Sequence, residues 1–137
     1  MSPEAIIASI GGLLGTAGFA FFVARRLPKR IKSVQYVSKW RALQKLCADK
    51  DMWPQVVLGA DDLLDEVLMK KQKSGKTMGE RMVSAQDNFT NNDALWQAHK
   101  LAGHLRHDKD KTYKLKELEV KESLVSFRQA MRDLGAL

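Results

Sequence analysis

The sequence is poor in several features that define common classes of protein. Its 137 residues include one cysteine, Cys47, so no intramolecular disulfide can form, which agrees with a reducing cytoplasm. Cys47 shares an apolar helical spacing with Tyr36, Trp40 and Leu43, which predicts a packed thiol. No segment alternates apolar and polar residues as a half-buried strand does. These absences argue against disulfide-bonded and β-sheet folds and favour an all-α fold.

Charged side chains are absent from Ala5 to Ala24. Twenty helical residues span about 30 Å, the thickness of the hydrocarbon core of a bilayer. A cleaved signal peptide would carry its positive charge before the apolar run, whereas here the cations follow it. We therefore expect an uncleaved transmembrane anchor in residues 1–24. A basic juxtamembrane segment in residues 25–32 would contact lipid headgroups through Arg25, Arg26, Lys29, Arg30 and Lys32.

The positive-inside rule gives this expected anchor an orientation. The cation-rich C-terminal side would lie in the cytoplasm and the N-terminus outside, as a single-pass protein of the cytoplasmic (inner) membrane. Small residues four apart allow close helix–helix contact in lipid, although such residues are common in membrane helices in general. The expected contact stripe comprises Ala8, Gly11, Gly12, Gly15 and Thr16.

The net charge of +7 is distributed unevenly along the chain. Residues 1–50 hold nine Lys and Arg against Glu4 and Asp49, whereas residues 51–137 hold fourteen of each sign. A nucleic-acid-binding surface would need its basic residues on the folded domain. The distribution therefore argues against nucleic acid as a partner and favours membrane lipids together with a protein partner or a second copy of the chain.

Residues 33–137 show helical periodicity throughout, and Thr77 with Glu80 forms a capping-box pattern. Short polar breaks between the periodic segments predict an antiparallel bundle of four to five helices after the transmembrane helix. The expected helices are 34–48, one from the Asp51 cap to about Lys70, one from the Thr77 cap to Phe89, one through Leu95–Leu105, and 114–134.

Complete catalytic motifs and metal-binding motifs are absent. Ser74-Gly75-Lys76-Thr77 resembles the end of a phosphate-binding loop, but Lys70 stands where that loop needs a glycine. His104, His107 and Asp108 lie within reach of one another on one helix, yet no established metal motif contains them. We therefore expect no cofactor and no metal.

An acidic turn comprises Asp61, Asp62, Asp65 and Glu66. It could be a site for a cation or partner, or a solvated face of the helix. Asp61 shares a column of the helix with Val57, Leu64 and Leu68, so its carboxylate lies at the edge of the core and needs a partner. Three residues could supply that partner: His99, Lys100 or Arg81. We expect a buried polar pair, with Asp61 and His99 as its members.

Several short patterns resemble one superfamily. They are Ala60-Asp61-Asp62-Leu63-Leu64-Asp65, Thr77-Met78-Gly79-Glu80-Arg81, Trp96-Gln97-Ala98-His99-Lys100-Leu101, His107-Asp108 and the ending Asp133-Leu134-Gly135. From about residue 50 the chain is similar to a group of small bacterial proteins, often membrane-anchored, whose helical part resembles the HEPN superfamily. That resemblance implies a helical bundle and, in active members, dimeric metal-independent ribonucleases or nucleotide binders.

The HEPN signature pairs an Arg with a His four to six positions later. His107 matches the His by analogy, but Ala102-Gly103 stands where related proteins have Arg-Asn, which leaves Lys100 as the cation. We therefore expect a non-enzymatic, membrane-anchored interaction module that faces the cytosol. The alternatives are a HEPN-like ribonuclease or nucleotide-binding module that uses His107 and Lys100, or an accessory subunit of a larger membrane complex.

Overall fold

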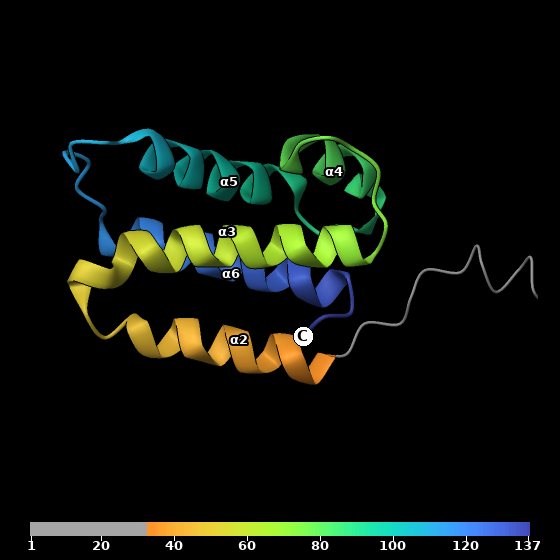
Figure 1. Cartoon of the computed structure of the whole chain (residues 1–137), viewed down its shortest axis with the longest axis horizontal. Helices are drawn as coiled ribbons and strands as arrows, with labels where there is room; N and C mark the ends of the chain where they lie inside the picture. Colours follow the sequence, from red (N-terminus) through yellow and green to blue (C-terminus); the bar gives the residue numbers. More distant parts are fainter. Residues whose placement is uncertain (1–32) are drawn as a thin grey trace, which may run out of the picture.

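The computed structural model describes residues 33–137, and all regular structure in this range is helical, as the sequence predicts (Figure 1). Two of the elements are single 3₁₀ turns. In chain order the elements are α2 (Ser33–Leu46), η1 (Lys50–Met52), α3 (Trp53–Lys70), α4 (Met78–Ser84), η2 (Gln86–Asn88), α5 (Asn92–His107) and α6 (Glu117–Asp133).

Local chemistry accounts for most helix ends. Thr77 accepts the Glu80 amide and the Glu80 carboxylate accepts the Thr77 amide, so α4 begins with the predicted capping box. Asn91 caps α5 by accepting the Ala94 amide. The expected cap at Asp51 is wrong: the Asp49 side chain accepts the Asp51 amide and starts η1 instead. The expected third helix is also shorter than predicted, because it ends at Ser84 and η2 follows.

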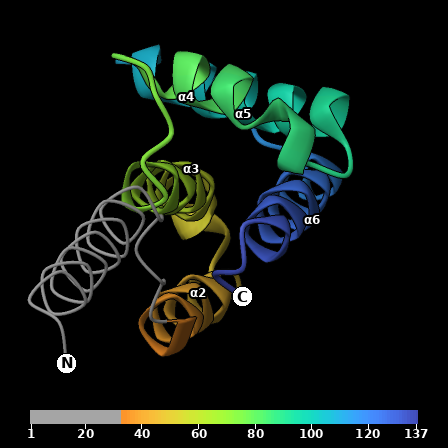
Figure 2. The same ribbon diagram turned by 90° about the vertical axis from the view of Figure 1, so that its right-hand side faces the viewer.

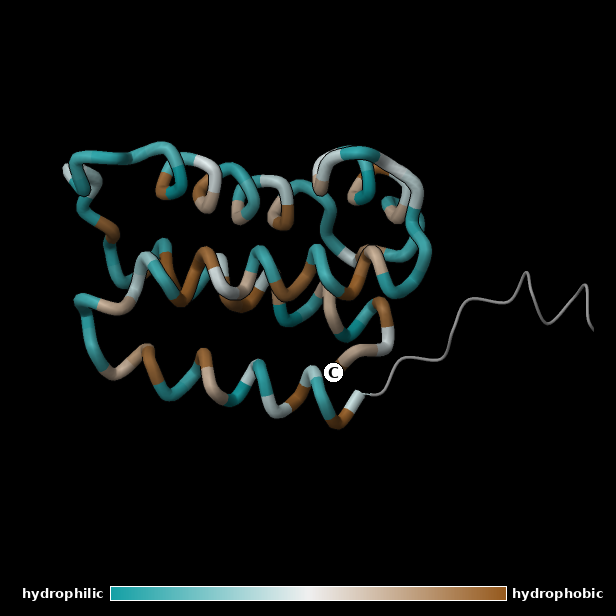
Figure 3. The backbone as a smooth tube through the Cα atoms, viewed as in Figure 1, coloured by the Kyte–Doolittle hydropathy of each residue, from teal (hydrophilic) through white to brown (hydrophobic). Residues whose placement is uncertain are grey.

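The core forms around α3, which packs against α2, α4, α5 and α6. Figure 2 shows α3 and α6 side by side, with α4 and α5 across one side of this pair and α2 across the other. The hydrophobic segments of α5 face α3 in Figure 3. The chain ends beside α2, where Ala136 is fully buried (Figure 1). The buried residues of α3 are Val56, Val57, Ala60, Asp61, Leu63, Leu64, Val67 and Leu68.

The transmembrane part of the predicted fold class is corrected. Among residues 33–137 no helix combines the length and apolarity needed to cross a bilayer. The longest, α3, has 18 residues and carries the four carboxylates of the acidic turn, which lipid would not solvate. The expected anchor, with its small-residue stripe and its cationic flank, falls in residues 1–32, outside the described range. The absence of a membrane-crossing helix among residues 33–137 also corrects the predicted single-pass topology and inner-membrane localisation.

Candidate functional site

Asp61 is a buried carboxylate in the middle of α3, with 1% of its surface exposed. Its Oδ1 lies 2.7 Å from His99 Nδ1 on α5. Its Oδ2 accepts hydrogen bonds from Arg106 Nη1 and Nη2 at 3.3 and 3.2 Å, and Arg106 also bonds to Asp62 at 2.9 Å. The structure thus brings together the two residues predicted as a polar pair and adds Arg106, which the sequence analysis did not include.

This network joins α3 to α5 through charge. Because a carboxylate only accepts hydrogen bonds, this contact requires a proton on His99 Nδ1, and the Trp96 ring packs edge-on against the imidazole at 5.9 Å between centroids. A carboxylate removed from water is stable when two donors satisfy its oxygens. The geometry is that of a structural ion pair across the α3–α5 contact.

The other two carboxylates of the acidic turn, Asp65 and Glu66, also pair with cations. Asp65 accepts two hydrogen bonds from Arg81, at 2.7 and 2.9 Å, and Glu66 pairs with Lys39 of α2 at 2.9 Å. Hydrogen bonding to Asp65 raises the pKa of Arg81 above its already high ordinary value, so the guanidinium remains charged. The acidic turn therefore fastens α3 to α2, α4 and α5. Among residues 33–137 no cluster of His, Cys, Asp or Glu could hold a metal ion.

Lys100 takes no part in this network, and both Lys100 and His107 line a shallow hollow of about 400 Å³. Gly103, His104 and Asp108 complete the lining. Asp108 is already engaged as a loop cap. It accepts the amides of Tyr113 and Thr112 and the Thr112 hydroxyl, and these hydrogen bonds lower the pKa of its carboxyl group. The two weak catalytic candidates are therefore neighbours, without a guanidinium beside them.

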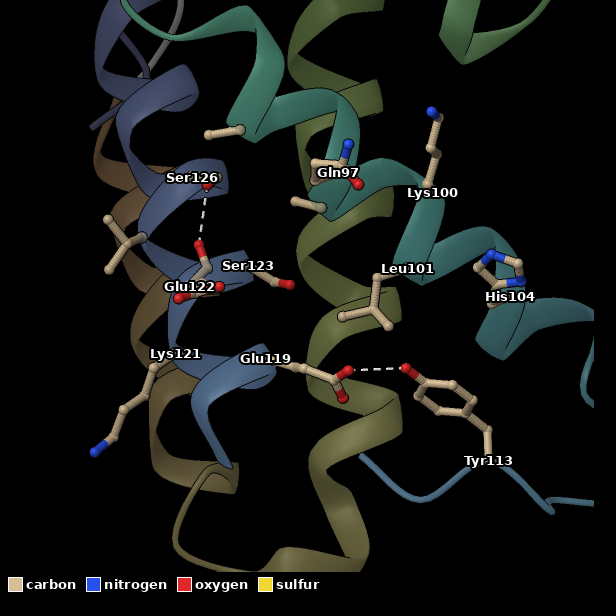
Figure 4. Close-up of a pocket in the computed structure, with 13 residues that line it drawn as sticks. Gln97, Lys100, Leu101, His104, Tyr113, Glu119, Lys121, Glu122, Ser123 and Ser126 are labelled. Atoms are coloured by element: carbon tan, nitrogen blue, oxygen red, sulfur yellow. Dashed lines mark hydrogen bonds between the residues drawn. The ribbon is translucent and has the colours of Figure 1, made fainter. Parts of the chain in front are cut away.

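A larger groove, of about 660 Å³, lies between α5 and α6 (Figure 4). Its apolar lining consists of Ala94, Ala98, Leu101 and Val125. Its α5 wall carries Gln97, Lys100 and His104, and its α6 wall carries Glu119, Lys121, Glu122, Ser123 and Ser126.

One end of the groove is closed by a pair of side chains. The Tyr113 hydroxyl donates to Glu119 Oε1 at 2.9 Å (Figure 4). The amide of Lys116 and this hydroxyl lower the pKa of Glu119, while hydrogen bonding to Glu119 raises the pKa of Tyr113. Because both groups keep their ordinary protonation states at neutral pH, the end of the groove is held by a charge-assisted bond.

The α6 wall also presents a buried hydroxyl, and the outer face of α6 carries two exposed apolar side chains. Ser123 is 5% exposed, and its hydroxyl points into the groove with no hydrogen bond to the other residues drawn in Figure 4. Val125 is 68% exposed, and Leu118, seven positions earlier on the same face, is 64% exposed. The sequence analysis missed this groove. The available sequence signal was Val125, an apolar residue of the groove lining that falls outside the buried stripe of α6.

No family model, no curated protein and no solved structure matches the chain.

Proposed function

We propose that this chain is a protein-interaction module that receives a helix of its partner in the groove between α5 and α6. The open apolar groove is the observation that carries this proposal. Grooves of this kind take the apolar face of an amphipathic helix, with anchor side chains about one turn apart. Val125 is the most exposed apolar residue that lines it. Burying such a side chain on binding contributes about 1.5 kcal/mol or more.

The remaining chemistry of the bundle supports binding over catalysis. His99, Arg81 and Arg106 are each committed to a carboxylate of α3. They join helices to one another, so these charged groups stabilise the bundle and do not face the groove.

Photo-cross-linking from inside the groove tests the proposal. A photoreactive amino acid replaces Val125 in the full-length chain, and the matched control carries it at Met69, an exposed apolar residue of α3 that does not line the groove. We expect irradiation in cells to give a discrete cross-linked protein at position 125 and none at position 69. The proposal fails if the two positions give the same result.

A HEPN-like ribonuclease or nucleotide-binding module is the second candidate, because His107 and Lys100 line one hollow. Cleavage of RNA by this route needs a proton carrier and a cation for the phosphate. Arg106 is turned toward Asp61 and Asp62, so Lys100 would have to be that cation. RNA cleavage by the full-length protein, compared with a His107→Ala variant, decides the matter: equal activity in both eliminates this candidate.

A further inference from the structure

Ser123 is a buried residue of the groove whose hydroxyl group is left without a hydrogen-bonding partner. It is 5% exposed, its side chain is directed into the groove, and it bonds to none of the other residues drawn in Figure 4. Ser126, one turn later on the same wall, instead donates its hydroxyl to the Glu122 carbonyl at 2.9 Å. Among residues 33–137 the only side-chain polar atom that is both fully enclosed and unbonded is Trp40 Nε1, so the Ser123 hydroxyl is open to the groove. A molecule that enters the groove therefore meets a free hydroxyl among the apolar side chains of its lining.

A helix seated in the groove removes water from this hydroxyl. A buried hydroxyl that loses its hydrogen bond to water without gaining another weakens binding by about tenfold or more. We propose that the partner helix carries an uncharged hydrogen-bonding side chain (Asn, Gln, Ser or Thr) within its apolar face, where this side chain bonds to the Ser123 hydroxyl. This inference rests on the function proposed above. The side chain is uncharged because a charge in the same place would be removed from water without a counterion.

The rims of the groove indicate the charge of the same helix. Lys100 and His104 stand about one turn apart on the α5 wall, and Glu122 stands on the α6 wall. None of the three forms an ion pair with another residue of the described range 33–137. Charges of opposite sign across an interface attract each other and fix the register of the two partners. The partner helix therefore carries carboxylates along the edge that lies over α5.

This helix belongs to a different protein. A groove-binding helix needs exposed apolar side chains three or four positions apart. No helix of residues 33–137 offers such a pair, because the large exposed apolar residues are scattered over the surface: Val34, Leu46, Met69, Val83, Tyr113, Leu118 and Val125. The apolar run from Ala5 to Ala24 contains no charged side chain, so it lacks the acidic edge.

Replacing Ser123 by Ala in the full-length chain tests the polar contact through the sign of its effect. The photoreactive amino acid at position 125 reports binding, at matched expression levels below those that saturate the cross-link. We expect Ser123→Ala to lower the yield of cross-linked partner about fivefold or more, because the polar side chain of the partner loses its hydrogen bond. If the partner were apolar at this point, Ser123→Ala would remove an unpaired hydroxyl, and the yield would rise.

Ser126→Ala is the matched control, because the Ser126 hydroxyl is already bonded within α6, and we expect it to leave the yield unchanged. Urea unfolding separates binding from folding. The Ser123 hydroxyl bonds to no other residue drawn in Figure 4, and Ala favours the helix, so Ser123→Ala should be at least as stable as the wild-type protein. A yield that is unchanged or higher in Ser123→Ala overturns the polar contact.

Charge reversal tests the acidic edge. Lys100→Glu should lower the cross-link yield about tenfold at low salt, because it places like charges across the interface. Lys70→Glu makes the same change at an exposed lysine of α3 outside the groove, and should have no effect. Equal yields in the two variants overturn the acidic edge.

Mass spectrometry of the cross-linked peptide provides a direct check on the chemistry of the partner. We expect a helical segment of another protein, with one uncharged polar residue inside its apolar stripe and carboxylates along one edge. A purely apolar stripe, or a peptide of this chain itself, overturns the inference and leaves the interaction module standing. The same yield at positions 125 and 69 overturns the interaction module and this inference together.

Discussion

Replacing His99 is expected to destabilise the bundle more than neutralising Asp61, the carboxylate to which His99 is hydrogen-bonded. His99→Leu leaves the Asp61 carboxylate buried, with Arg106 as its remaining donor at 3.2 Å, and Arg106 is shared with Asp62. Unpairing a buried charge costs about 3–5 kcal/mol, and the retained Arg106 places this case near 3 kcal/mol. Asp61→Asn keeps an oxygen that accepts the His99 N–H. This substitution removes the buried charge, and Arg106 still bonds to Asp62. We therefore expect it to lower the free energy of unfolding by only about 1 kcal/mol.

A double-mutant cycle sharpens this expectation. In the Asp61→Asn background no buried charge remains to be left unpaired, so His99→Leu should cost about 1 kcal/mol there, a coupling of about 2 kcal/mol. Urea unfolding followed by circular dichroism gives each free energy of unfolding, and His107→Leu, at an exposed position of the same helix, is the matched control. The reasoning is refuted if His99→Leu costs no more than Asp61→Asn, or costs the same in both backgrounds.

Three further predictions concern the loop before α4, the core and acid stability. Gly75→Ala should cost about 2 kcal/mol of unfolding free energy, because φ is +144° and the new Cβ would lie 2.6 Å from Glu80 Cβ; Gly103→Ala, with nothing within 4 Å, should instead stabilise α5 by about 0.5 kcal/mol. Thermal and urea unfolding compare the two, and equal effects would contradict the account. Phe127→Ala, at a fully buried position of α6, should cost about 3–5 kcal/mol in the same assay, and a cost below about 1 kcal/mol would mean that the core is not packed as described. Burial raises the pKa of Asp133, but hydrogen bonds from Thr90 and Gln129 outweigh it and lower the pKa below its ordinary 3.8, so the stabilisation is present above that pH and is lost as the pH falls through the lower folded-state pKa. Asp133→Asn should flatten this acid limb of the unfolding free energy, and an unchanged limb would exclude the carboxyl group as its source.

The helices and their inward faces were predictable because helical periodicity is a local property. The run from Val56 to Leu68 repeats its apolar residues at three and four positions, and those residues are the buried ones of α3. The Thr77 capping box was equally predictable from the sequence, because both of its hydrogen bonds join residues three positions apart. Asp51 was misread, since Asp49 two positions earlier competes for the same role and the choice depends on how the chain turns between α2 and α3.

The partners of the charged residues were less predictable. Asp61 was expected at the core edge, and three candidate partners satisfied its helical position equally well. The crossing of α3 and α5 places His99 and Arg106 beside it, Arg81 reaches Asp65 from α4, and Lys100 lines the groove between α5 and α6 instead. Helical spacing places a residue on a face of its own helix but does not place the neighbouring helix against that face.

The sequence by itself thus determined that residues 33–137 are helical, which residues face the core, and that one carboxylate there requires a partner. The tertiary structure decided which cations meet the four carboxylates of α3, that no guanidinium of residues 33–137 lines the hollow at His107, and that α5 and α6 leave an apolar groove between them. The physical reason is range. Helix formation depends on residues three and four positions apart, whereas ion pairs between helices and the shape of a groove depend on how separate helices cross and pack.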